Sequence, residues 1–214
     1  DLHPFPNQSH APNACDQRYN PGVCGFIGYL RLPTGDQENL DAQLEPMSAL
    51  LAHRGPDDAG LFRSPQCSMA HRRLSIIDRS EAGRQPMSSG PITLATNSEI
   101  YNHAQLAQAH GLSDTLRSKT DTEVLLRLIE TRGVSDTLSR IDGMYAFAAW
   151  DAAAHTLHLA RDPFGIKPLF VLEHNHVLWF ASEIKPLLLV PGFQRTPSRE
   201  ALYHFLSLDY IPGP

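Results

Sequence analysis

Residues 24–30 have the sequence Cys-Gly-Phe-Ile-Gly-Tyr-Leu, a nearly continuous apolar run that follows a proline-rich segment. A run of this length is typical of a strand that is buried on both faces. Four more strand-like segments follow one another between Met144 and Ala181, with short turns between them. Strands therefore cluster at both ends of the chain. This distribution predicts the α+β class, with two stacked antiparallel sheets and helices outside, rather than a parallel βαβ sheet.

Helices are expected between and after these strands. Leucine and methionine recur at helical spacing in residues 38–52, which predicts an amphipathic helix. Asn102 can cap a short helix, and Thr120–Glu123 has the capping-box pattern of a longer one. A last helix is expected from about residue 198. The expected strands are 24–30, 60–64, 67–78, 92–97, 144–150, 156–160, 169–172 and 177–181.

Composition limits the kinds of partner and compartment. The chain has 214 residues, of which 42% are hydrophobic and 19% charged, as expected for one globular domain. A net charge of -5 gives no basic footprint for nucleic acid or for an anionic membrane. No apolar run approaches the ~18 residues that span a bilayer, and the N-terminal segment lacks the pattern of a signal peptide. We therefore expect a cytoplasmic protein without nucleic-acid or membrane partners.

The cysteines and histidines give no sign of a disulfide framework or a metal site. Cys15, Cys24 and Cys67 are few, odd in number and not arranged as a CxxC pair. The 11 histidines show no zinc-ligand spacing. No metal is assigned to these residues, and Cys15 and Cys67 receive no functional role.

Cys24 is the candidate nucleophile, because a thiol is intrinsically reactive near neutral pH. Hydrolysis of an amide also needs a base and donors for the oxyanion of the tetrahedral intermediate. Spacing along the chain indicates no histidine partner for Cys24. The other available base is a free α-amine, whose pKa of ~7.7–8.0 suits general-base catalysis. That route requires Cys24 to be the first residue of the working protein.

Several segments closely resemble the glutaminase domain of glutamine-dependent asparagine synthetases. They keep the family's order and cover nearly all of residues 24–190. The His-Arg-Gly-Pro-Asp and Gly-Ile-Lys-Pro-Leu runs resemble the asparagine synthetase branch rather than the hexosamine or purine amidotransferases. The segments are Cys24–Gly28, His53–Asp57, His71–Asp78, Gly83–Pro86, Asn97–His103, Thr120–Glu123, Ala160–Phe170 and Phe180–Lys185.

The resemblance implies the N-terminal-nucleophile hydrolase fold, a four-layer αββα sandwich, and the hydrolysis of L-glutamine to glutamate and ammonia. Cys24 would be the nucleophile, which forms a γ-glutamyl thioester, and its own α-amine would accept the proton. The other implied roles are Arg73 on the α-carboxylate, Glu99 and Asp121 on the α-ammonium, and the Asn97 amide with the Ser98 backbone N–H as the oxyanion hole.

The residues alone allow simpler readings of these positions. Arg73 is also compatible with a surface arginine beside Arg72, Asp121 with a helix cap and Asn97 with an ordinary turn residue. Lys167 and Asp162 are expected to brace the sheet and receive no catalytic part.

A larger protein is also implied. Residues 191–214 would be a linker and the start of a C-terminal synthetase domain, which would use ATP and Mg²⁺ to adenylate a carboxylate such as aspartate. No cofactor is expected within the residues of this chain, and a homodimer is compatible with the sequence. Two alternatives stay open. One is a catalytically weak or inactive scaffold domain, and the other is an amidotransferase for a different acceptor.

Two features depart from the family's pattern. Ser98 stands where the family has glycine, and a positive φ there would cost about 1 kcal/mol or more and tilt the oxyanion donor. That reasoning predicts weakened activity that Ser98→Gly would raise. The second departure is the extension, residues 1–23. It is compatible with a propeptide, with a mis-assigned start in which Val23 occupies the initiator position, and with a retained, blocking segment.

Overall fold

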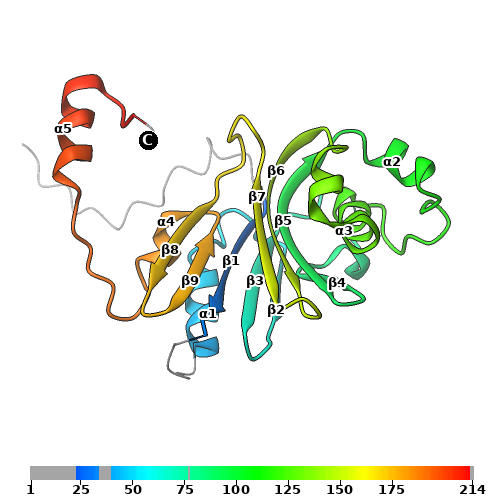
Figure 1. Ribbon diagram of the computed structural model, residues 1–214, viewed down its shortest axis with the longest axis horizontal. Helices are drawn as coiled ribbons and strands as arrows, with labels where there is room; N and C mark the ends of the chain where they lie inside the picture. Colours follow the sequence, from blue (N-terminus) through cyan, green and yellow to red (C-terminus); the bar gives the residue numbers. More distant parts are fainter. Residues whose placement is uncertain (1–22, 34–39, 77, 213–214) are drawn as a thin grey trace, which may run out of the picture.

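The computed structural model describes residues 23–33, 40–76 and 78–212 and contains two antiparallel sheets that face each other (Figure 1). The first sheet has the strand order β2-β3-β1-β9-β8, and the second has the order β4-β5-β6-β7. The strands are β1 (Gly25–Arg31), β2 (Asp58–Phe62), β3 (Cys67–Arg73), β4 (Met87–Ser89), β5 (Ile92–Ile100), β6 (Gly143–Asp151), β7 (Thr156–Arg161), β8 (Phe170–His174) and β9 (Val177–Ala181). The helices are α1 (Asp41–Ala49), η2 (Glu81–Gly83), α2 (His103–Ala109), α3 (Asp121–Leu138), α4 (Ile184–Leu187) and α5 (Arg199–Leu208).

Strand β1 is the centre of the first sheet and pairs with β3 on one side and β9 on the other. Its side chains alternate between two cores. Ile27 and Tyr29 pack with Leu44 of α1, whereas Phe26 packs against residues of the second sheet such as Ala146. Because both faces are covered, the strand needs an apolar residue at nearly every position. The buried strand predicted from the apolar run is confirmed.

Three layers of apolar side chains hold four layers of secondary structure together. One core lies between the first sheet and helices α1 and α4, and another lies between the second sheet and α3. The third core lies between the sheets, where small residues such as Ala95 and Ala148 pack in one cluster with the large rings of Trp150 and Phe180. The predicted α+β class and the αββα order are confirmed.

Gly28 is the point where β1 comes closest to its neighbours in this middle core. A Cβ added at Gly28 would overlap the Phe180 ring and the Ser68 carbonyl. We expect Gly28→Ala to lower the free energy of unfolding by about 1–3 kcal/mol, the usual cost of overpacking a core. Urea unfolding followed by tryptophan fluorescence measures the change, and an unaltered midpoint would mean that Phe180 moves aside at little cost.

Several predicted boundaries are wrong by a few residues. The strand predicted over 67–78 ends at Arg73, because the chain then turns and the Ser75 N–H is bonded to the Asp57 carboxylate at 2.7 Å. Strand β5 continues to Ile100, beyond the predicted 97. The helix predicted over 38–52 is α1, and residues 38–39 lie outside the described part. Strand β4 and helix α4 were not predicted, since three or four residues carry too little periodicity.

The helix caps follow the sequence only in part. Thr120 accepts a hydrogen bond from the Glu123 N–H at 3.3 Å, which is half of the predicted capping box. The Glu123 carboxylate does not return to Thr120 but accepts from the backbone N–H groups of Arg117 and Ser118. Asn102 occupies the expected N-cap position, yet its side chain bonds to backbone groups of the α3–β6 connection instead of capping α2.

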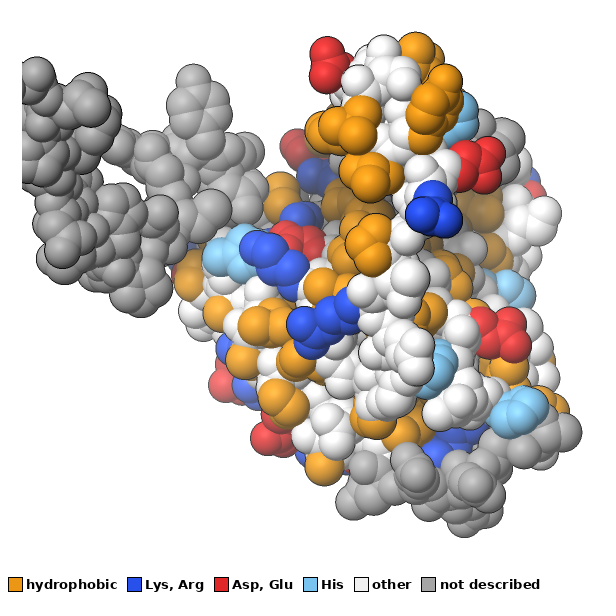
Figure 2. Space-filling view, turned by 90° about the vertical axis from the view of Figure 1, so that its left-hand side faces the viewer, with side chains coloured by type: hydrophobic (Ala, Val, Ile, Leu, Met, Phe, Trp, Pro, Cys, Tyr) orange, Lys and Arg blue, Asp and Glu red, His pale blue; other side chains and the backbone are white. Residues whose placement is uncertain are grey.

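Helix α5 stands apart from the sandwich, and none of its residues is buried. Figure 2 looks onto this side of the molecule and shows apolar side chains exposed near its top, where the helix lies. The extension predicted over 1–23 falls outside the described residues except for Val23. Among the residues that the structure describes, no helix combines the length and the apolar character needed to cross a membrane.

Candidate active site

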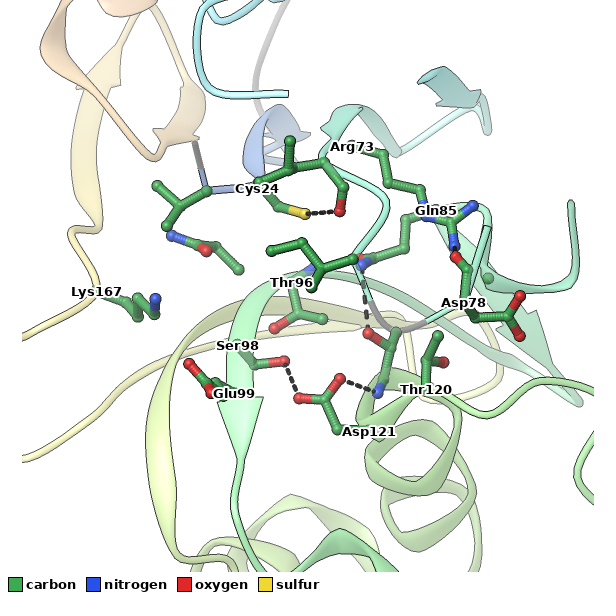
Figure 3. A pocket seen from close by; sticks show the side chains of 16 residues that line it. Cys24, Arg73, Asp78, Gln85, Thr96, Ser98, Glu99, Thr120, Asp121 and Lys167 are labelled. Carbon is green, nitrogen blue, oxygen red and sulfur yellow. Dashed lines mark hydrogen bonds between the residues drawn. The ribbon is translucent and has the colours of Figure 1, made fainter. Parts of the chain in front are cut away.

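A cavity of about 160 Å³ lies where the start of β1, the end of β3, the middle of β5 and the start of α3 meet (Figure 3). All six residues to which the sequence analysis gave a role line it, although they come from four separate segments. They are Cys24, Arg73, Asn97, Ser98, Glu99 and Asp121.

Cys24 directly precedes β1, and its backbone is held by the His-Arg-Gly-Pro-Asp segment. The Arg54 Nε donates to the Cys24 carbonyl at 3.1 Å, and the Arg54 Nη1 forms an ion pair with Glu183 at 3.0 Å. His53 bonds to the same Glu183 oxygen at 2.8 Å. The Cys24 thiol itself donates a long hydrogen bond to the Leu74 carbonyl, with 3.8 Å between sulfur and oxygen.

The cavity keeps the Cys24 thiol protonated at neutral pH. Burial raises the pKa of the Cys24 thiol above its ordinary value, and the positive charges of Arg73 and Lys167 only oppose that rise. The negative charge of Asp121 adds to the rise. A nucleophilic thiolate at this position therefore needs a base that removes the proton during the reaction.

Asn97 lines the cavity and has a side-chain hydrogen-bond donor without a partner among the described residues. Its side chain shares the inner face of β5 with Ala95, which packs in the core between the sheets. Asn97 is 2% exposed, and its Nδ2 has no hydrogen-bond partner in the described part of the chain. Leaving a buried donor unpaired costs about 1–3 kcal/mol, so an orphan donor on a residue that lines a cavity is a candidate partner for a bound ligand.

The backbone of β5 directs the Ser98 N–H to the same place. In an antiparallel strand, the N–H groups of every second residue point to the same side. The N–H groups of Thr96 and Ile100 point away from β6, because they donate to side-chain oxygens of Gln85 (2.7 Å) and Asp121 (2.9 Å). Ser98 lies midway between them, so its N–H points to this open edge of β5, where the cavity begins.

Asp121 and Glu99 supply negative charge in two different settings. Asp121 is buried, and its carboxylate accepts hydrogen bonds from Ser98 Oγ (3.1 Å), the Ile100 N–H and the Thr122 N–H (both 2.9 Å). Burial raises the pKa of Asp121, and these donors oppose the rise. The Glu99 side chain is exposed at the edge of the cavity, and no described residue makes a hydrogen bond to it.

Comparison with known proteins shows the family to which the chain belongs. A family model described as a glutamine amidotransferase domain matches residues 23–214. The chain belongs to the glutamine amidotransferase family. The amidotransferase domain is 37% identical over 199 residues to asparagine synthetase [glutamine-hydrolyzing] 1 of Bacillus subtilis, a match that covers 90% of this chain and 30% of that protein. Asparagine synthetase B of Escherichia coli is 37% identical over 171 residues, 78% of this chain and 30% of that protein.

These matches confirm the resemblance to the glutaminase domain of asparagine synthetases, and they show that the chain spans 30% of the length of these two relatives. Among solved structures, glutamine phosphoribosylpyrophosphate amidotransferase from B. subtilis has a TM-score of 0.65. The match covers 78% of this chain and 43% of that chain at 24% identity, which establishes a shared fold.

Three further residues support the site of this amidotransferase domain, and the sequence analysis missed their roles. Arg54 lies in a motif that was recognised without a function. Gln85 is buried and bridges the Thr96 N–H and the Thr122 hydroxyl, which ties β5 to α3.

Lys167 was expected to brace the sheet with Asp162. Asp162 does so by accepting the Ile166 and Lys167 N–H groups, whereas the Lys167 side chain lines the cavity (Figure 3).

Arg73 is held by the turn that follows β3. Its Nη1 donates to the Ser80 carbonyl at 2.9 Å and its Nη2 to the Asp78 carbonyl. Hydrogen bonds from the Lys119 N–H and from Ser80 hold the pKa of the Asp78 carboxyl at about 2, so this side chain stays ionised and anchors the turn. A Cβ added at Gly83 would overlap the Arg73 guanidinium.

We expect Gly83→Ala to displace the Arg73 guanidinium and to raise the KM for L-glutamine about tenfold, since a lost hydrogen bond to a charged group has that effect on affinity. The kcat should change little, because the role implied for Arg73 is to bind the α-carboxylate of glutamine, at the opposite end of the substrate from the amide. Steady-state kinetics measure both constants. Ala82→Ser, at an exposed position of the same turn, is the control, and an equal rise in KM there would contradict the steric argument.

Proposed function

We propose that this domain hydrolyses L-glutamine to glutamate and ammonia through a γ-glutamyl thioester at Cys24. The observation that carries the proposal is the buried Asn97 side chain, whose Nδ2 has no partner among the described residues and which lines the same cavity as Cys24. A tetrahedral oxyanion formed at the thiol would give this donor its partner. The family match supports the same chemistry.

The cavity offers a group for each end of glutamine. Arg73 would bind the α-carboxylate with the guanidinium edge that the turn leaves free, and Asp121 with Glu99 would bind the α-ammonium. The side-chain amide would then reach Cys24.

The reaction begins when the sulfur adds to the amide carbon. The amide oxygen takes negative charge, and Asn97 Nδ2 with the Ser98 N–H stabilises this oxyanion. The amide nitrogen takes up the proton that the base removed from the thiol, the C–N bond breaks, and ammonia leaves. Water then cleaves the thioester to glutamate and restores the thiol.

The proton acceptor is the α-amine of Cys24 in this proposal. Among the described residues that line the cavity there is no histidine. Of the carboxylates there, Glu99 and Asp121 are assigned to substrate binding, and Asp78 anchors the turn after β3. In the chain described here the nitrogen of Cys24 is joined to Val23 and lacks a basic lone pair. The proposal therefore requires a working form in which Cys24 is residue one.

We further propose that the ammonia serves an ATP- and Mg²⁺-dependent synthetase domain that converts aspartate to asparagine in the cytoplasm. The support is the naming of the relatives, of which this chain matches 30% of the length. The binding sites for ATP and Mg²⁺ would belong to that domain and not to the residues of this chain. A homodimer is compatible with this arrangement. A different ammonia acceptor is the competing assignment, and product analysis of the full-length protein separates the two.

The direct test measures glutamate and ammonia released from L-glutamine by protein that begins at Cys24. We expect equal amounts of both products, and no release from D-glutamine, whose α-groups cannot reach Arg73 and Asp121 together. A chloroketone analogue of glutamine should label Cys24 and block turnover. Absence of both release and labelling would overturn the proposal in favour of an inactive scaffold.

A further inference from the structure

The Ser98 side chain occupies one side of the Asp121 carboxylate. Asp121 is 6% exposed, and its Oδ2 accepts two hydrogen bonds, from Ser98 Oγ and from the Ile100 N–H. Its Oδ1 accepts one, from the Thr122 N–H. A carboxylate oxygen has about two lone-pair sites, so Oδ2 is fully used and Oδ1 retains one site. Figure 3 shows the Ser98 hydroxyl turned toward the Asp121 carboxylate at the border of the cavity.

The backbone at Ser98 is relaxed, contrary to the expectation of strain. Ser98 lies inside β5, opposite Tyr145 of β6, and is not among the described residues with positive φ. A Cβ is therefore tolerated at this position without a conformational cost. The argument that serine weakens activity by tilting the backbone donor loses its basis, and the hydroxyl needs a different account.

We propose that the Ser98 hydroxyl is a positioning residue that acts through Asp121 to orient and keep ionised the carboxylate that binds the substrate's α-ammonium. This inference rests on the proposed function of the cavity. The hydroxyl and the Ile100 N–H fix Oδ2, which leaves the open lone pair of Oδ1 as the acceptor for an ammonium group. The contact depends on serine, since the glycine expected here from the family pattern has no donor to offer Asp121.

Loss of the hydroxyl has a defined electrostatic result. Each donor to a buried carboxylate favours its ionised form, so removing Ser98 Oγ raises the pKa of Asp121 further above its usual value. Asp121 binds the α-ammonium only when ionised. As the pH falls, a variant without the hydroxyl will therefore lose substrate affinity at a higher pH than the original protein.

The experiment compares Ser98→Ala with the unaltered protein, both processed to begin at Cys24. Alanine keeps the backbone N–H and the strand, and removes only the hydroxyl. We expect the KM for L-glutamine to rise about ten- to hundredfold, the effect of one hydrogen bond to a charged group, with a much smaller change in kcat. The acid limb of kcat/KM should move to higher pH, and Ser98→Thr should restore both properties.

Ser88→Ala is the matched control, because the Ser88 hydroxyl bonds to Thr93 in the same sheet and is not part of the cavity lining. It should leave KM and the pH profile unchanged. A Ser98→Ala enzyme with unchanged KM and an unmoved acid limb, or with a raised kcat, would overturn the inference.

Binding of L-glutamate to Cys24→Ala protein separates this inference from the proposed hydrolysis. The dissociation constant should rise by a similar factor when Ser98→Ala is added, and ¹³C NMR should show the Asp121 carboxyl titrating at higher pH. Suppose that the original protein releases no ammonia but that Ser98→Ala still raises the dissociation constant and shifts the Asp121 titration. The hydrolysis proposal then fails and the positioning role stands. If Ser98→Ala changes neither the binding nor the titration, the positioning role fails even in a protein that hydrolyses glutamine.

Discussion

Protein that begins at Cys24 will hydrolyse L-glutamine, and protein that retains Val23 will be slower by a factor of about 10²–10⁴, the usual contribution of a general base. The cause lies in the nitrogen of Cys24. As a free amine it has a pKa of ~7.7–8.0 and can take the thiol proton near neutral pH. As an amide it cannot. The raised pKa of the buried thiol makes this acceptor necessary, because little thiolate forms without one.

Intact mass spectrometry identifies each form, and ammonia release measures its activity. Cys24→Ala in the form without the extension should lower turnover by about 10⁴–10⁶, as expected when a nucleophile is removed. Cys67→Ala is the matched control. Cys67 is buried in the middle core, where burial raises its pKa to about 12, so its removal should spare activity. Equal activity of the forms with and without Val23 would contradict the role of the α-amine.

The pattern of apolar residues was sufficient to predict the centre of the fold. Residues 24–30 could be assigned as a buried strand because β1 is covered by α1 on one face and by the second sheet on the other. The strands β6 to β9 were predictable one by one from their apolar residues and turns, but their expected arrangement as one meander is wrong. β6 and β7 belong to the second sheet, whereas β8 and β9 belong to the first, and residues 162–169 cross between the sheets. Boundaries were less predictable. Strand β3 ends where Asp57, distant in sequence, captures the Ser75 N–H, and no local pattern carries that information.

The candidate site was predictable in its members but not in its supporting contacts. The resemblance named six of the residues that line the cavity, and the structure brings these six together. The resemblance could not show that the Lys167 side chain lines the cavity. That direction depends on the turn in which the Asp162 carboxylate accepts the backbone N–H groups of Ile166 and Lys167. Arg54 was visible in a motif, yet its contact with the Cys24 carbonyl depends on two segments that meet only in the fold.

Ser98 shows where a general rule does not apply. Glycine at a functional position often marks a positive φ, and strain was expected for serine only if φ were positive there. Ser98 is not among the described residues with positive φ. The strand register decides the matter instead. Ser98 lies within the regular pairing of β5 with β6. In this conformation its backbone N–H points to the open edge of β5, and its hydroxyl donates to Asp121. Backbone direction within a sheet depends on pairing with a partner strand, here β6.

Asn97→Ala should lower kcat about 10²–10³-fold and leave the KM for L-glutamine nearly unchanged, because an oxyanion donor acts mainly in the transition state. The free energy of unfolding should not fall to a comparable extent. Asn97 Nδ2 has no partner in the described structure, so its removal takes away a buried donor that costs free energy in the resting protein. Steady-state kinetics and urea unfolding on the same samples test both expectations.

Asn102→Ala supplies the opposite pattern and is the matched control. The Asn102 side chain donates to the Arg140 carbonyl at 2.8 Å and accepts from the Asp142 N–H at 3.0 Å, away from the cavity. Its loss should cost about 1–3 kcal/mol of unfolding free energy and spare kcat. If Asn97→Ala instead raised KM at constant kcat, Asn97 would bind the ground state of glutamine and would not stabilise an oxyanion. A donor whose deletion slows the reaction without weakening the fold is one that the structure keeps for the reacting substrate.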